Sequence, residues 1–154
     1  MAIRPGDDTA QRAEALTQRL SSEPEDREAL RELFELYEAR AAAEPSTEGK
    51  LAAWSELAAQ CERTGQIDGA VSAFERARAL APSDVKLAHA LAGALVQRSA
   101  RADETKRALD LDRVADLLCD VASALTPREA RKFLIAALGH AAWHARALFE
   151  LESL

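Results

Sequence analysis

The sequence is poor in the residues that build β-sheets and in those that usually mark chemical sites. Aromatic residues make up 5% of the 154 residues, and there are only two cysteines and six glycines. Valine and isoleucine are scarce, which leaves little material for strands. Alanine is the most common residue instead. We therefore predict an all-α protein whose helices approach one another closely over alanine side chains.

The cysteines, glycines and apolar stretches exclude several kinds of site. Cys61 and Cys119 lie far apart in apolar helical patterns, so we expect two buried thiols in a reducing compartment, without a disulfide or a metal pair. The glycines are scattered singly, so no phosphate-binding loop is expected. The N-terminus lacks the apolar segment of a secretory signal, and charged residues interrupt the most apolar stretch, 133–151. These features predict a cytoplasmic protein without a membrane span.

The charge of the chain argues against nucleic acid as a partner. The formal net charge is −6 at pH 7, and no block of like charge exceeds a few residues. Nucleic-acid binding needs clustered lysine and arginine to release counterions. RNA binding by a related helical-repeat design stays a third interpretation, which a salt titration against RNA would test.

Proline, glycine and capping residues divide the chain into helix-sized segments. We expect helices over 8–21, 24–43, 47–63, 67–80, 85–98 and 111–125, followed by a last segment from Pro127 that Gly139 divides. The polar stretch 99–110 is interpreted as an insertion, either an extended connection or a frayed helix. The predicted organisation is a disordered N-terminus over 1–7 and a single helical domain over 8–154.

The segments repeat. Residues 67–82 align with 112–127 at an offset of 45, with small residues opposite small residues and proline opposite proline. The preceding helices align at an offset of 34, so that Trp54, Leu57, Ala58 and Cys61 match Ala88, Leu91, Ala92 and Leu95. The second unit is longer by the polar insertion, which costs little because it loops out between two helices.

One repeat resembles a known family. Over 51–84 the positions Trp54, Leu57, Ala58, Cys61, Ala70, Phe74, Ala77 and Pro82 have the spacing of the tetratricopeptide repeat, a 34-residue helix-turn-helix. Ala58 and Cys61 replace the usual glycine and tyrosine. The resemblance is degenerate elsewhere in the chain. It implies a right-handed superhelical stack of antiparallel helix pairs, about three to four of them, because one pair cannot bury its own apolar face.

The same resemblance implies where a partner would dock. Peptides usually bind that family through fixed positions on the first helix of each pair. On this chain these positions are Ser55, Ala59, Glu62 and Arg63 in one unit and Lys86, His89, Val96 and Gln97 in the next, together with Ala52 and Gly93. The alternative is that these side chains only face solvent and bind no partner. The clamp for a terminal carboxylate is disfavoured, because Ser55, Ala59 and Ala90 occupy positions that need other residues.

No catalytic constellation or cofactor motif is apparent. His140 and His144 have i, i+4 spacing, which can chelate a metal, but no third ligand is evident and Ala141 replaces the glutamate of the zinc-protease motif. Acidic pairs such as Glu25-Asp26 lie at helix starts, where the helix dipole explains them. We expect no enzyme activity, no cofactor and no metal site.

The C-terminal segment has apolar residues on more than one face, among them Phe133, Trp143 and Phe149. A terminal repeat helix should have a polar outer face. Three explanations stay open: the segment packs on the preceding helices, it covers a second subunit or a partner, or the chain is a fragment of a longer array. Two functions follow. The first is a non-catalytic scaffold that binds a peptide or protein in its groove, and the second is a structural subunit that assembles through Phe133, Trp143 and Phe149.

Overall fold

A computed structural model describes residues 5–154 of the protein, and its side chains from Asp8 onward. Within that range it contains eight α-helices and no strand. The helices are α1 (Pro5–Ser22), α2 (Arg27–Ala43), α3 (Thr47–Arg63), α4 (Ile67–Leu80), α5 (Val85–Ser99), α6 (Glu104–Ser123), α7 (Pro127–His140) and α8 (Ala145–Glu152).

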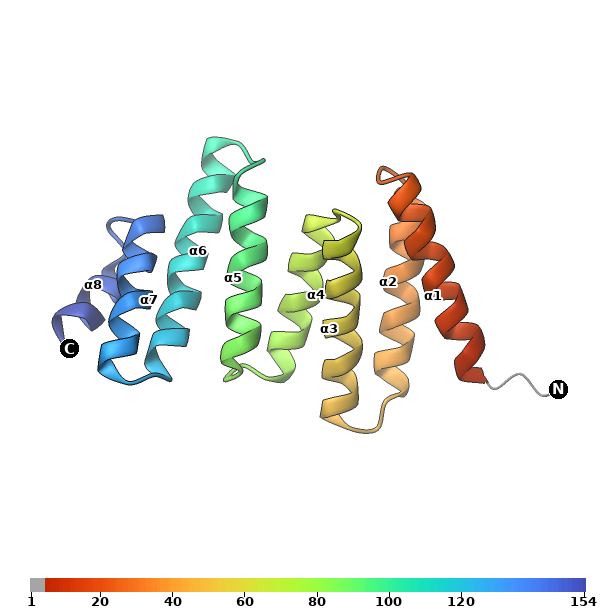
Figure 1. Cartoon of the computed structure of the whole chain (residues 1–154), viewed down its shortest axis with the longest axis horizontal. Helices are drawn as coiled ribbons and strands as arrows, with labels where there is room; N and C mark the ends of the chain where they lie inside the picture. The colour runs from red at the N-terminus through yellow and green to blue at the C-terminus, as the bar shows by residue number, and fades with distance from the viewer. Residues whose placement is uncertain (1–4) are drawn as a thin grey trace. The chain divides into compact units, whose positions relative to one another are not determined.

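The chain divides into two compact units. Unit 1 comprises residues 1–80 with α1 to α4, and unit 2 comprises residues 81–154 with α5 to α8. Within each unit, consecutive helices pack against one another (Figure 1). The predicted all-α fold of packed helix pairs is confirmed, whereas a single domain over 8–154 stays a prediction.

In unit 1, the apolar residues of α3 and α4 form the core. The predicted stripes are buried: Trp54, Leu57, Ala58 and Cys61 on α3, and Ala70, Phe74 and Ala77 on α4. Small residues let the helix axes of α3 and α4 approach each other. At Gly69 the fit is tight, since an added Cβ would lie 3.0 Å from the Cys61 sulfur and 3.3 Å from the Phe34 ring. The predicted break lies at Thr64-Gly65, where Gly65 adopts a positive φ of 74°, a conformation that favours glycine.

Polar contacts link α2 to both later helices of unit 1. The Tyr37 hydroxyl of α2 donates to Glu56 of α3 at 2.9 Å, and Arg40 pairs with the same carboxylate at 2.7 Å. Arg76 of α4 pairs with Glu38 of α2 at 2.9 Å, and its guanidinium lies 4.8 Å from the centre of the Trp54 ring. The second helix of one pair is therefore joined to the first helix of the next.

In unit 2, residues 104–110 of the polar stretch are helical, so the extended connection is wrong and the helical alternative is the one that the structure has, whereas an insertion relative to the preceding repeat stays a prediction. Helix α6 begins at Glu104, with the Asp103 side chain as its N-cap, seven residues before the expected start. Asp110 lies on the buried face of this helix, where it accepts two hydrogen bonds from Arg98 of α5 at 2.9 and 2.7 Å. A charged residue at a buried position hides the apolar pattern, so the sequence looks uniformly polar there.

Three other helix boundaries differ from the predictions. Helix α1 begins at Pro5, ahead of the expected Asp8, and residues 1–4 of the predicted disordered N-terminus lie outside the described residues. Helix α2 begins after Asp26, whose carboxylate caps the Ala29 amide, and Pro24 belongs to the preceding turn. The last segment is divided at residues 141–144, and Gly139 remains inside α7.

Candidate functional site

The predicted partner-binding residues of unit 1 share one face of α3. Ala59, Glu62 and Arg63 are exposed and Ser55 is half-buried, whereas the stripe that contains Trp54 is buried. Arg63 donates to Gln60 on its own helix. This face is therefore accessible and is not required for the core of unit 1.

The predicted partner-binding residues of unit 2 lie on α5. Lys86, His89 and Gln97 are exposed, and Val96 is half-buried. Between them, Gly93 leaves open space, because a Cβ added there would meet no atom within 4 Å. The backbone of α5 is therefore accessible at Gly93, between the predicted binding residues.

One contact joins two residues that the sequence analysis assigned to different sites. His89 of α5 and Phe133 of α7 lie edge to face, with their ring centroids 6.2 Å apart. The spacing of these residues in the sequence gives no hint of this contact. Phe133 is half-buried beside α5, so in unit 2 it belongs to the same surface as the predicted partner-binding residues.

The other two residues predicted for assembly are far more exposed. Trp143, in the turn between α7 and α8, retains 90% of its accessible surface, and Phe149 on α8 retains 70%. Ile135 of α7 and the terminal Leu154 are also more than half exposed. Apolar residues therefore reach the surface of unit 2 at α7 and α8, whereas most apolar residues of α5 and α6 are buried.

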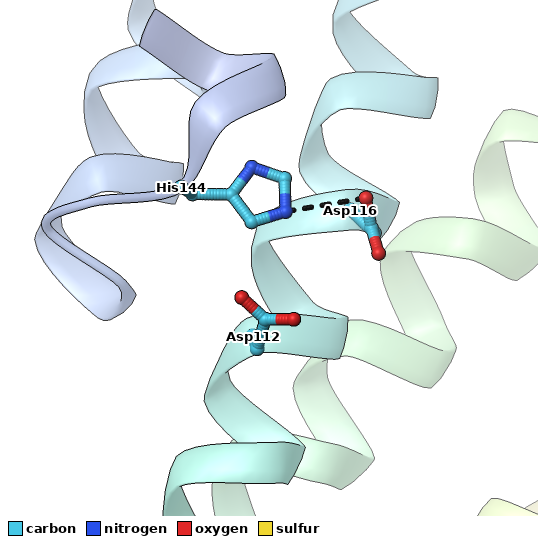
Figure 2. A group of neighbouring side chains, drawn as sticks. All are labelled: Asp112, Asp116 and His144. Atoms are coloured by element: carbon cyan, nitrogen blue, oxygen red, sulfur yellow. Dashed lines mark ion pairs between the residues drawn. The ribbon is translucent and has the colours of Figure 1, made fainter.

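A cluster of potential metal ligands lies between α6 and α8 (Figure 2). The ligand atoms of Asp112, Asp116 and His144 all lie within 4.8 Å of one another. His144 is 8% exposed, and both aspartates are exposed. The predicted pair of His140 and His144 does not form on one helix, because residues 141–144 leave the helix after α7. The sequence analysis missed both aspartates, which lie about thirty residues before the histidine.

The contacts of His144 explain the cluster without a metal. The Ala147 amide donates to His144 Nδ1 at 3.3 Å and caps α8, so this nitrogen must be unprotonated. The proton of the neutral ring then lies on Nε2, which is 3.2 Å from a carboxylate oxygen of Asp116. A metal on Nε2 would require the proton to move to Nδ1 and the cap to break. The geometry therefore favours a structural role, in which His144 caps α8 and holds its start beside Asp116 of α6.

The two thiols are unsuited to nucleophilic chemistry. Cys61 and Cys119 are both free and buried. Burial raises the pKa of Cys61 to about 12 and that of Cys119 to about 11. Both thiols are therefore protonated at neutral pH, and the thiolate is the form that reacts.

The comparisons with known proteins bear on one part of the chain. The family described as tetratricopeptide repeat matches residues 51–94, which span most of α3, all of α4 and the first part of α5. The resemblance predicted from the sequence is confirmed over these residues. No curated protein and no solved structure matches the chain. Among the described residues, none of the helices is both long and apolar enough to span a bilayer.

Proposed function

We propose that the chain is a non-catalytic scaffold that binds a peptide or protein partner at the positions that form the concave groove of tetratricopeptide repeats, which lie on an exposed face of α3 in unit 1 and on one of α5 in unit 2. The observation that carries this proposal is the tetratricopeptide match over 51–94, which includes most of α3 and the first part of α5 and so all but two of the docking positions, Val96 and Gln97. The residues at these positions are exposed or half-buried, so they are available to a partner: Ser55, Ala59, Glu62, Arg63, Lys86, His89, Val96 and Gln97. A cytoplasmic location is part of the proposal and is supported by the two buried free thiols.

Capture from native cell extract tests the scaffold proposal. We expect the Lys86→Glu/His89→Ala variant to retain its partner at least about tenfold less well than the unchanged chain, because charge reversal on a docking surface opposes the partner. The Arg27→Glu/His140→Ala variant is the matched control, since it also reverses one positive charge and replaces one histidine, at exposed residues outside this face. Quantitative mass spectrometry of the captured proteins measures the ratio. Equal capture by all three proteins would remove α5 from the binding surface.

A second function is favoured by the exposure of Trp143 and Phe149. Large apolar side chains with this much exposed surface are typical of interaction sites. On this alternative the chain forms a homo-oligomer or joins a larger assembly through α7 and α8. We expect light scattering to show a dimer at high concentration, and the Trp143→Ser/Phe149→Ser variant to be monomeric. A monomeric unchanged chain at high concentration would exclude self-assembly.

A further inference from the structure

Helix α8 is held to unit 2 by few buried atoms. It has eight residues and contributes one buried side chain, Ala147, whereas α7 contributes three and α6 eight. Leu148 and Leu151 are half-buried, and Phe149 is exposed. An isolated helix of this length is unstable in water, so α8 persists through its packing on α6 and α7. Segments with so few buried contacts open at a lower free energy than the core around them.

The edge of α6 that borders α8 carries a row of carboxylates. Asp112, Asp116 and Asp120 recur every four residues, which places them along one face of the helix. Figure 2 shows Asp112 and Asp116 on the side of α6 that faces His144. Asp120 continues this row, because it contacts Arg146 of α8 at 2.7 Å. Three carboxylates therefore line one side of the contact between α6 and α8.

The basic residues of α6 do not pair with the first two carboxylates of this row. Arg107 donates to backbone oxygens at the end of α5 and in the turn after it. Within the part of the chain that the structure describes, neither Lys106 nor Arg113 forms an ion pair with Asp112 or Asp116. The row therefore retains negative charge beside the start of α8.

Helix α8 matches this row poorly in charge. The Nε of Arg146 donates to Glu150 on its own helix, and the Nη1 donates to Asp120, both at 2.7 Å. One guanidinium is therefore shared by two carboxylates, one of which α8 itself brings to the row. His144 adds no charge beside Asp116, because its ring is neutral when it caps α8. A helix with more basic residues would suit the row better than α8 does.

We propose that the surface of α6 and α7 that α8 covers is a binding site for a basic amphipathic helix of a partner protein, and that α8 is its displaceable cover. The partner helix has a small residue in the place of Ala147 and lysine or arginine opposite Asp116 and Asp120. The net charge of −6 on the chain attracts such a helix at long range. The site is separate from the predicted docking positions on α3 and α5, so it goes beyond the proposed scaffold function.

Cys119 of α6 reports whether α8 is in place. The thiol is fully buried, and charges of both helices act on it, those of Glu150 and Arg146 from α8 and those of Asp116 and Asp120 from α6. Cys119 therefore lies beneath the contact between the two helices. Cys61 is equally buried in the core of unit 1 and is the internal reference.

Thiol labelling of the full chain with a maleimide tests whether α8 is displaceable. Ala147→Glu puts a charged side chain at a fully buried position and should detach α8, whereas Ala145→Glu makes the same change at an exposed residue of the same helix. We expect Ala147→Glu to label Cys119 at least about tenfold faster than the unchanged chain, and Ala145→Glu to stay within about threefold. Labelling of Cys61 and hydrogen exchange in α5 and α6 should not change.

Fluorescence anisotropy with labelled peptides tests the partner. The basic probe has the sequence of residues 142–154 with lysine in place of His144 and Glu150, and the second probe has the sequence unaltered. We expect the Ala147→Glu chain to bind the basic probe at least about tenfold more tightly than the unaltered probe. The unchanged chain should bind the basic probe at least about tenfold more weakly than the Ala147→Glu chain does, because α8 competes for the site.

Two further variants, made in the Ala147→Glu chain, locate the charge that attracts the probe. Asp116→Asn/Asp120→Asn should weaken binding of the basic probe by about tenfold. Glu23→Gln/Glu25→Gln removes the same amount of charge at exposed residues of unit 1 and should change the binding by less than about twofold. Equal weakening by both pairs would mean that net charge, rather than this site, governs binding.

Four other results would overturn the inference. Unchanged labelling of Cys119 in Ala147→Glu would show that α8 does not cover the thiol. Faster labelling together with faster exchange throughout α5 and α6 would show that α8 cannot leave without the unfolding of unit 2. Equal binding of the two probes would remove the preference for basic residues. A dimer of the unchanged chain that Ala147→Glu abolishes and Trp143→Ser/Phe149→Ser retains would assign the site to α8 of a second copy. None of these results affects the scaffold proposal, which the Lys86→Glu/His89→Ala variant tests.

Discussion

The Tyr37→Ala variant is expected to lower the free energy of unfolding of unit 1 by about 3–5 kcal/mol. Tyr37 retains 1% of its accessible surface, and its ring fills the contact between α2 and α3. Arg40 lies over this ring at 5.7 Å, and the hydroxyl donates to Glu56. Truncation to alanine removes the ring and leaves a cavity between two helix pairs. Urea denaturation followed by circular dichroism measures the change.

Two further variants separate the parts of this effect. Tyr37→Phe retains the ring and removes only the hydroxyl, so we expect a loss of about 1 kcal/mol, with Arg40 still paired to Glu56. Phe149→Ala removes an aromatic ring that is 70% exposed and should change the stability by no more than about 0.5 kcal/mol. If Tyr37→Ala were as stable as Tyr37→Phe, the ring would not be packed between the helices.

The result bears on why the repeats need one another. The helices of a single pair bury only part of their apolar surface, and the rest must be covered by a neighbouring pair. Tyr37 belongs to the second helix of one pair, and Glu56 belongs to the first helix of the next. A large loss at Tyr37 would show that contact between pairs, as well as within them, stabilises unit 1.

The sequence predicts α3 and α4 well because local signals agree with the packing there. Ser46 is the cap of α3, Thr64-Gly65 is the break, and the apolar stripes face the core. The start of α6 was predicted seven residues too late because Asp110 occupies a core position as a charged residue, and only its contact with Arg98 explains this. A pattern of apolar residues cannot reveal a core position that is occupied by an ion pair.

The candidate sites were predictable only in part, for a related reason. Exposure of Lys86 and His89 follows from the helical periodicity of α5 and the repeat resemblance. The contact of His89 with Phe133 does not, because it depends on how α5 and α7 are placed beside α6. The cluster at His144 was missed because Asp112 and Asp116 are distant in sequence, and their carboxylates meet the histidine only when α8 packs on α6.

The Asp110→Ala variant is expected to lower the free energy of unfolding of unit 2 by about 3 kcal/mol. The Asp110 side chain is 5% exposed and accepts both hydrogen bonds from Arg98, whose side chain is 23% exposed. Removal of the carboxylate leaves the guanidinium partly buried and deprived of this partner. Because Arg98 retains some contact with water, we expect a loss of stability at the lower end of the range that is typical of broken buried ion pairs. Urea denaturation of the full chain, followed at unit 2 by hydrogen exchange, measures the loss.

Replacement of both partners by apolar residues separates the effect of the buried charge from the effect of the lost side-chain volume. In Arg98→Met/Asp110→Leu, apolar side chains of similar size occupy the contact between α5 and α6, and no charge remains buried there. Such replacements are often neutral, so the double variant should recover most of the stability that Asp110→Ala loses. Glu104→Ala, an exposed change on the same helix, should cost less than about 1 kcal/mol. A double variant as unstable as Asp110→Ala would mean that the pair itself stabilises unit 2, beyond the penalty of an unpaired charge.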